Sequence, residues 1–295
     1  MPGGETYLTQ VEEGLATAIA SARRTREFPS NVMLRLADRQ TLKEGTGTAW
    51  REFLSDTLSA SDASETGTYD NPQELDGSIL QATPTLVICQ TFIGDRVQLR
   101  LDPKAYNTFG SLAQDAMNRK KDQDLLLIFA TATTTLAGTG QTLASGHIIA
   151  AAQRIRADAT EPWAGRLCCV DHGYARADIA NELLAGVGSY PLPEGQTARV
   201  YANGFEGRID SVEFYVDGLI AVDSTPDVRG AVFASGDDGA VVCVQGKSPW
   251  MDKRYEPDRG YGGWNIWHKD EYVVVERSPG NWMFSLLSDG TAPTS

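Results

Sequence analysis

Apolar residues recur at helical spacing in four parts of the chain. Residues 6–24 carry one apolar face and end in a basic cluster. The longest pattern covers residues 102–131, where Asp102 supplies an N-cap and the following proline suits the first helical position. At 1.5 Å per residue this predicts a helix of roughly 43 Å. Shorter helices are predicted over residues 147–157, with Ser145 as the cap, and over 174–185, ending at a glycine.

Strand patterns fill most of the remaining chain. Residues 83–101 are rich in β-branched residues and contain a Gly94-Asp95 turn signal, whereas residues 133–143 have the composition of a loop. Residues 166–170 indicate a short buried strand. Apolar and polar positions then alternate through the C-terminal part of the chain, in residues 198–222, 231–246 and 271–290. Helices and strands in this order predict an α+β fold.

Residues 37–82 form a long polar stretch that contains little apolar material to bury. A connection of this length is uncommon inside a compact domain. The stretch is therefore either disordered or an arm that folds against another molecule. Trp50, Phe53 and Leu54 in its middle favour the arm.

Composition narrows the class of function. The 295 residues have a formal net charge of −13 and a pI of about 4.7, which argues against tight wrapping of nucleic acid but suits a container wall. The longest apolar run, residues 125–130, is too short to cross a bilayer, so we expect no membrane partner. The four cysteines lie in apolar runs and are predicted to be buried free thiols.

Motifs for catalysis and cofactor binding are weak. Gly246-Lys247-Ser248 resembles the end of a phosphate-binding loop, but Val241 stands where that loop needs a glycine, so we interpret it as a strand-to-turn exit. In residues 168–172 (CCVDH) the two thiols point to opposite faces of a strand, which favours a structural role over a metal site. Asp237-Asp238 between glycines indicates a tight turn. We expect no catalytic residue, cofactor or metal ion.

The order of these elements resembles the major capsid proteins of tailed phages, which have the Hong Kong 97-type fold. The segments that carry the resemblance are residues 1–31 (an N-terminal arm), 43–77 (an extended hairpin arm, the E-loop), 102–131 (a spine helix), 145–186 and 204–217 (an axial domain), and 240–246 with 271–284 (closing strands). The resemblance implies five parts: an N-terminal arm (1–36), the E-loop (37–82), a peripheral domain with the spine helix (83–140), an axial domain (141–235) and return strands of the peripheral domain (236–295).

A protein of this kind is a structural subunit without enzymatic activity. The resemblance implies self-assembly into hexamers and pentamers that form an icosahedral head around double-stranded DNA, which it encloses without sequence-specific binding. It also implies contacts with a portal and with scaffolding or decoration proteins where these are used, assembly in the host cytoplasm, and a final location in the virion.

The polar stretch supplies the candidate contact residues between subunits. Charges alternate in sign along it, and each exposed ion pair contributes only about 0–1 kcal/mol, so the aromatic residues are the better anchors. The candidate set is Lys43, Glu44, Trp50, Arg51, Glu52, Phe53 and Asp56.

Two other functions remain open. An encapsulin-type nanocompartment shell has the same fold but encloses enzymes, and the nucleic acid content of purified particles separates it from a capsid. A strand-rich hydrolase or carbohydrate-binding module would use the aromatic residues of the C-terminal part, such as Trp250 and Trp264, and predicts a small monodisperse species.

Overall fold

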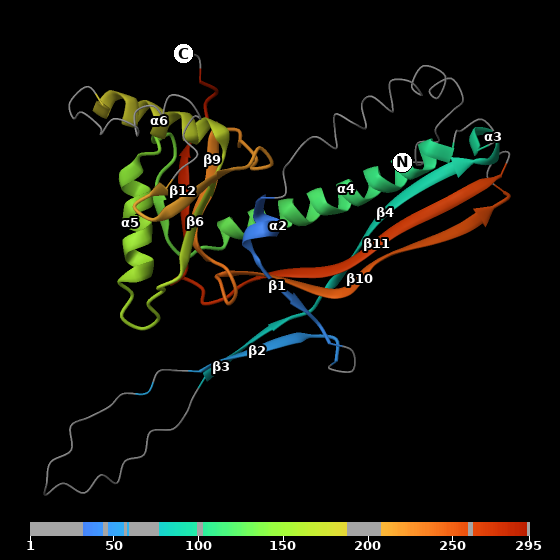
Figure 1. The fold of residues 1–295 in the computed structure, drawn as a ribbon, viewed down its shortest axis with the longest axis horizontal. Coiled ribbons are helices and arrows are strands. Elements are labelled where there is room, and N and C mark those ends of the chain that lie inside the picture. The colour runs from blue at the N-terminus through green and yellow to red at the C-terminus, as the bar shows by residue number, and fades with distance from the viewer. Residues whose placement is uncertain are drawn as a thin grey trace, which may run out of the picture.

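The protein has a mixed α+β fold, as the sequence predicted: two β-sheets, a long helix and a projecting hairpin. The structure is a computed structural model that describes residues 32–43, 47–55, 58, 77–98, 103–187, 208–258 and 262–293. The helix predicted over residues 6–24 lies outside the described residues. In Figure 1 the long helix and the longer strands run across the molecule from a compact α/β body.

Helix α4 (Pro103–Leu127) confirms the long helix, and a 3₁₀ turn, η1 (Ile128–Ala130), continues it. At 1.5 Å per residue, α4 is about 37 Å long. Its C-terminal end enters the hydrophobic core, where Leu125 and Phe129 are fully buried. None of the described helices is both long and apolar enough to span a membrane.

The four-stranded sheet has the order β1-β10-β11-β4, and α4 runs alongside it. Its long strands are antiparallel neighbours: β10 (Val241–Glu256), β11 (Gly263–Glu276) and β4 (Thr85–Gly94). The short β1 (Asp38–Thr41) pairs in parallel with β10. Just before it, α2 (Val32–Leu36) buries Met33 and Leu36 in the core.

The six-stranded sheet has the order β5-β12-β9-β6-β8-β7 and carries α5 (Ser145–Arg156) and α6 (Gly173–Val187). Its central strands are almost wholly buried, which explains their continuous apolar sequence. All four cysteines are free, and Cys168, Cys169 and Cys243 are buried as predicted, whereas Cys89 on β4 is only partly buried. The strands are β5 (Thr135–Ala137), β6 (Arg166–Asp171), β7 (Arg208–Ile209), β8 (Val212–Val216), β9 (Asp227–Ser235) and β12 (Met283–Asp289).

Two strand predictions were wrong. Residues 83–101 are not one strand region, because the turn at Gly94 leads into a short helix, α3 (Asp95–Gln98). Gly246-Lys247-Ser248 is not a strand exit, because it lies inside β10. Two register shifts against β11, between residues 245 and 250, form a bulge there that accommodates Pro249 within the strand.

Two smaller predictions also need correction. Part of the predicted loop 133–143 is β5, which pairs in parallel with β12. Ser145 does not cap α5 but is its first residue, and its amide and hydroxyl donate to Glu182 of α6. Gly186 lies within α6 rather than beyond its end. The turn at Asp237-Asp238 is confirmed, since Asp238 has a positive φ of 63° and the Gly239 amide donates to the Gly236 carbonyl.

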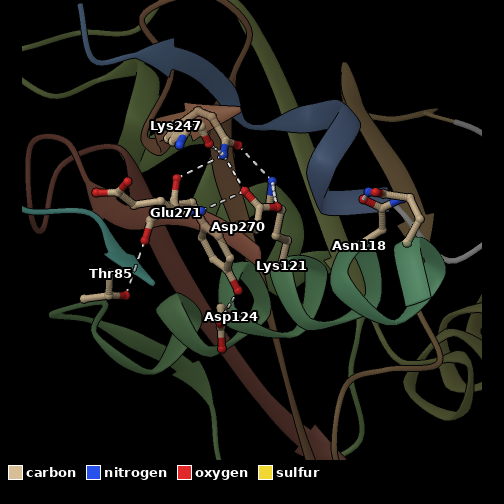
Figure 2. A network of polar contacts seen from close by, with 10 residues as sticks. Thr85, Asn118, Lys121, Asp124, Lys247, Asp270 and Glu271 are labelled. Carbon is tan, nitrogen blue, oxygen red and sulfur yellow. Dashed lines mark hydrogen bonds and ion pairs between the residues drawn. The ribbon is translucent and has the colours of Figure 1, made fainter. Parts of the chain in front are cut away.

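A buried polar network joins α4 to the sheet beneath it (Figure 2). Lys121 Nζ lies 2.6 Å from Asp270 Oδ2 of β11 and donates to Gln245 Oε1 of β10 at 2.8 Å. One turn along the helix, Asp124 accepts a hydrogen bond from the Tyr272 hydroxyl at 2.7 Å. Because Lys121 and Asp270 are almost completely buried, the loss of either charge leaves the other unpaired. The network therefore fixes the position of α4 along the strands.

A second buried contact joins α4 to α2 and to the six-stranded sheet. Asp122 is fully buried and accepts the Leu34 amide at 3.0 Å, and it faces the buried carboxyl of Asp217, just after β8. Burial and the Asp217 carboxyl raise the pKa of Asp122 to about 7. Burial also raises the pKa of Asp171, at the end of β6, to about 7. Asp122 and Asp171 therefore bind their protons more tightly in the folded protein than in the unfolded chain.

Stability should fall as the pH rises above about 4. A carboxyl whose pKa is raised in the folded state binds its proton more tightly there, so its contribution is complete below the unfolded pKa and is lost as pH passes 7. We expect Asp122 to cause a loss of about 2–4 kcal/mol between pH 4 and pH 8. The Asp122→Asn variant should show a shallower decline, with the Asp171 contribution remaining. Urea unfolding at pH 4 and pH 8 measures this, and an unchanged pH slope would contradict it.

Candidate assembly surface

A two-stranded hairpin projects from the body and belongs to neither large sheet (Figure 1). Its strands are β2 (Trp50–Ser55) and β3 (Gly77–Ala82), paired antiparallel with Trp50 opposite Ala82. Within the polar stretch, β2 and β3 thus form a projecting element, whereas residues 38–41 were wrongly included because they form β1 in the four-stranded sheet. An isolated two-stranded hairpin is only marginally stable in water. This hairpin depends on contacts at its base and on whatever covers its faces.

One face of the hairpin carries exposed apolar side chains. Phe53 and Ile79 are direct cross-strand partners, and they are 56% and 63% exposed. The Phe53 ring also lies over Gly77, where an added Cβ would meet that ring at 2.6 Å and the Leu54 carbonyl oxygen at 2.4 Å. Glycine at position 77 thus lets the aromatic ring cross to the opposite strand. The result is a small apolar patch with no cover from the described part of its own chain.

The base of the hairpin is held by one buried arginine, Arg277, which follows β11. Its Nε donates to Glu52 Oε2 of β2 at 2.9 Å, and its Nη2 donates to Asp38 Oδ2 of β1 at 3.0 Å. Its Nη1 donates to the Gly239 carbonyl oxygen at 2.8 Å. The guanidinium therefore links the hairpin to β1 and to the β9–β10 turn. Such fork geometry fixes direction as well as distance.

The predicted contact residues occupy different environments. Lys43 is exposed in the loop that follows β1. Arg51 and Phe53 are exposed on the hairpin. Trp50 is half-buried at the hairpin base, and Glu52 pairs with Arg277 of its own chain. Residues alternate between faces along a strand, so Trp50 and Glu52 lie on one face and Arg51 and Phe53 on the other. Glu44 and Asp56 lie outside the described residues.

Sequence reasoning missed three exposed apolar residues, one on the hairpin and two on β4. Ile79 completes the apolar patch, and its signal was the short apolar pair Ile79-Leu80 inside a polar stretch. Leu86 and Ile88 are 52% and 49% exposed on the same face of β4, which is an edge strand of the four-stranded sheet. An exposed apolar edge strand invites pairing with another chain. Arg277 was also missed, because a single arginine near a turn has no sequence signature of burial.

The cluster at residues 168–172 has a structural role in the geometry observed. Cys168 and Cys169 are buried in β6, and Asp171 accepts the His172 amide. His172 Nδ1 accepts the Tyr174 amide in the first turn of α6. Within the described residues, no group of three metal-ligating side chains converges on one point. The cluster therefore ends a strand and begins a helix.

Replacement of Arg277 should destabilise the body and free the hairpin. Arg277→Met leaves the buried Asp38 carboxylate unpaired, so we expect a loss of about 3–5 kcal/mol in the free energy of unfolding. Glu52→Gln keeps the shape of a partly exposed partner and should cost about 1 kcal/mol. Urea unfolding measures both, and limited proteolysis near the hairpin reports its release. A loss below 1 kcal/mol for Arg277→Met would contradict the role assigned to this residue.

Comparison with known proteins identifies solved structures that have a similar architecture. No protein-family model and no curated protein sequence matches the chain. Solved structures do match along most of its length. The capsid of Cyanophage P-SCSP1u aligns with a TM-score of 0.65 and 11% identity over 86% of this chain and 87% of that one. The structure of Mycobacterium phage Che8 aligns with a TM-score of 0.62 and 12% identity over 84% and 86%.

An encapsulin structure aligns about as well. The SrpI encapsulin of Synechococcus elongatus, solved as a holo complex, aligns with a TM-score of 0.64 and 11% identity over 92% of this chain and 91% of that one. At these identities the likeness establishes the backbone fold. The chain has the fold of the tailed-phage major capsid proteins, which this encapsulin shares.

Proposed function

We propose that this protein is the major capsid protein of a tailed phage and acts as a shell-forming structural subunit. The observation that carries the proposal is the projecting hairpin, whose Phe53–Ile79 patch is left uncovered by the described residues of a body that has the capsid fold. A subunit gains burial for such an element from a neighbour, and repeated identical contacts around rotation axes close a shell. In this role the chain needs complementary surfaces and no catalytic site.

The observed elements suggest how the parts of a Hong Kong 97-type subunit are distributed. We assign the E-loop to the β2–β3 hairpin and the residues between its strands, and the spine helix to α4. The four-stranded sheet is the proposed peripheral domain, and the six-stranded sheet with α5 and α6 is the proposed axial domain. Since β12 belongs to the six-stranded sheet, we assign the return strands of the proposed peripheral domain to β10 and β11.

The proposed partners follow from this role. Copies of the chain form hexamers and pentamers, and these build an icosahedral head that encloses double-stranded DNA. A portal, and scaffolding or decoration proteins where used, complete the particle. Assembly takes place in the host cytoplasm, and the mature protein resides in the virion. The acidic net charge of −13 supports a wall that does not grip the packaged DNA.

An encapsulin-type shell is the second candidate, favoured by the alignment with the SrpI encapsulin over nine-tenths of both chains. The two functions differ in cargo. Particles purified from cells infected with the source phage should contain double-stranded DNA that resists nuclease until the shell is opened. Particles that contain protein cargo and no nucleic acid would favour the encapsulin function.

The purified full chain should form assemblies far larger than its 31.9 kDa mass. Analytical ultracentrifugation and negative-stain microscopy measure this directly. We expect capsomers or shells at micromolar concentration. A single species of one chain's mass across the accessible range of concentration and salt would contradict the proposed function, and it would favour the hydrolase or carbohydrate-binding alternative.

The apolar patch of the hairpin should be required for assembly. The double variant Phe53→Ser/Ile79→Ser removes apolar area that a neighbour would bury, at about 25 cal/mol per Å². We expect at least a tenfold rise in the concentration needed for assembly, with little change in the thermal unfolding of the body. The matched control is Val222→Ser, at an exposed apolar residue on the loop between β8 and β9 of the six-stranded sheet. Equal assembly by the double variant and the control would contradict the proposed role of the patch.

A further inference from the structure

A basic pocket lies where α2, β1, α4 and β10 meet. Its volume is about 440 Å³, which is within the size range of small-molecule sites in proteins. Asn118 and Lys121, one turn apart on α4, form one side of it, and Figure 2 shows both beside the ribbon of the N-terminal elements. Arg35 of α2 and Arg39 of β1 also line it. Described residues of a single copy of the chain therefore form this pocket.

The charge of this pocket is opposite to that of the chain as a whole. Three of its nine lining residues are cationic and none is acidic, in a protein of net charge −13. Asp270 neutralises Lys121 at 2.6 Å. Arg35 and Arg39 are exposed, and within the described ranges neither arginine forms an ion pair with a carboxylate. The lining therefore has an excess of two positive charges.

Hydrogen-bond donors predominate among the polar groups that the lining leaves available. Arg39 donates through Nε and Nη2 to the Leu34 carbonyl oxygen, which leaves Nη1 available. The Asn118 side-chain oxygen already accepts Gln114 Nε2 at 3.1 Å, which leaves the Asn118 amide nitrogen as a donor. Arg35 adds a second guanidinium group, which has donors and no acceptor. A ligand in this pocket therefore gains most by supplying acceptor oxygens.

The Cys243 thiol, which also lines the pocket, shows that two of the cations act on the same space. Burial raises the pKa of this thiol, and the positive charges of Lys121 and Arg39 oppose that rise. The fields of a cation on α4 and of another on β1 therefore reach the same buried side chain. The Asp38 carboxylate, next to Arg39 in sequence, is held by Arg277 at 3.0 Å. It therefore does not neutralise the pocket.

We propose that this pocket binds a dianionic phosphate group, either inorganic phosphate or the phosphate of a nucleoside monophosphate. Two uncompensated guanidinium charges match the charge of about −1.5 to −2 that a phosphate monoester carries at pH 7. Its three acceptor oxygens accept from Arg35, Arg39 and Asn118 together, whereas a carboxylate offers only two oxygens. The bound group ties α2 and β1 to α4. The inference does not rest on the proposed function, because one copy of the chain supplies every lining residue.

Titration of the full chain measures the binding directly. Isothermal titration calorimetry with sodium phosphate, at neutral pH and constant ionic strength, should show one saturable site per chain with a dissociation constant of about 1 mM or below. Adenosine 5′-monophosphate distinguishes the source of the phosphate group. A higher affinity for the nucleotide identifies a nucleotide as the ligand, and an equal or lower affinity identifies the free ion. Binding weaker than about 1 mM for both probes would overturn the inference.

Variants of the full chain assign the binding to this pocket. Arg35→Gln/Arg39→Gln removes both free charges and should lower the affinity for phosphate at least tenfold. Its matched control is Arg119→Gln, at an exposed arginine on α4 outside the pocket, which should leave the affinity unchanged. If the double variant does not fold, Asn118→Asp keeps the acceptor for Gln114 and places a negative charge among the donors, with a similar loss expected. Unchanged affinity in a folded pocket variant would overturn the inference.

Hydrogen exchange locates the ligand and separates binding from a general effect of charge. Phosphate at constant ionic strength should slow the exchange of amides in α2 and β1, in the wild type and in Gln123→Glu. Gln123→Glu is the matched control for Asn118→Asp, because it adds the same charge to α4 outside this pocket. Asn118→Asp should show no such protection. Equal protection in Asn118→Asp and the wild type, or protection confined to other elements, would contradict the assignment to this pocket.

Discussion

The three hydrogen bonds donated by the buried Arg277 guanidinium are the contacts on which the position of the hairpin depends. One buried guanidinium reaches β1, β2 and the β9–β10 turn, and the three contacted residues lie between 38 and 239 positions from Arg277 in sequence. A buried charge with two carboxylate partners and one carbonyl partner is stable only if all of them stay in place. The hairpin therefore leaves the body in a fixed direction, although its two strands gain little stability from each other.

A fixed direction and an uncovered apolar surface together suit the hairpin to the proposed role in assembly. The Arg277 contacts orient the Phe53–Ile79 patch outward, and no described element of the same chain covers it. The body behind it is rigid, because the Lys121–Asp270 pair fixes α4 on its sheet and Asp122 joins α4 to α2. A rigid body with an oriented, incomplete arm suits repeated assembly with copies of itself.

The sequence predicted those features that depend on local pattern. Helix α4 was found because apolar spacing and Asp102-Pro103 agree over many turns, and the buried strand β6 because its residues are continuously apolar. Local sequence pattern gave wrong element boundaries where tertiary contacts determine the structure. Ser145 was predicted to cap α5, but it is the first residue of that helix, and its hydroxyl donates to Glu182 of α6. Gly246 and Pro249 looked like a strand end, but pairing with β11 carries β10 through a bulge. Arg277 was not predicted at all, because its partners come from three distant segments.

Hydrogen exchange in the hairpin tests the central claim most directly. The amides of β2 and β3 should exchange rapidly in the unassembled full chain and become strongly protected in assembled particles. The amides of β6 and β9 in the core should be protected equally in both states. Equal protection of the hairpin before and after assembly would mean that its own body already stabilises it, and that would contradict an arm completed by a neighbouring copy.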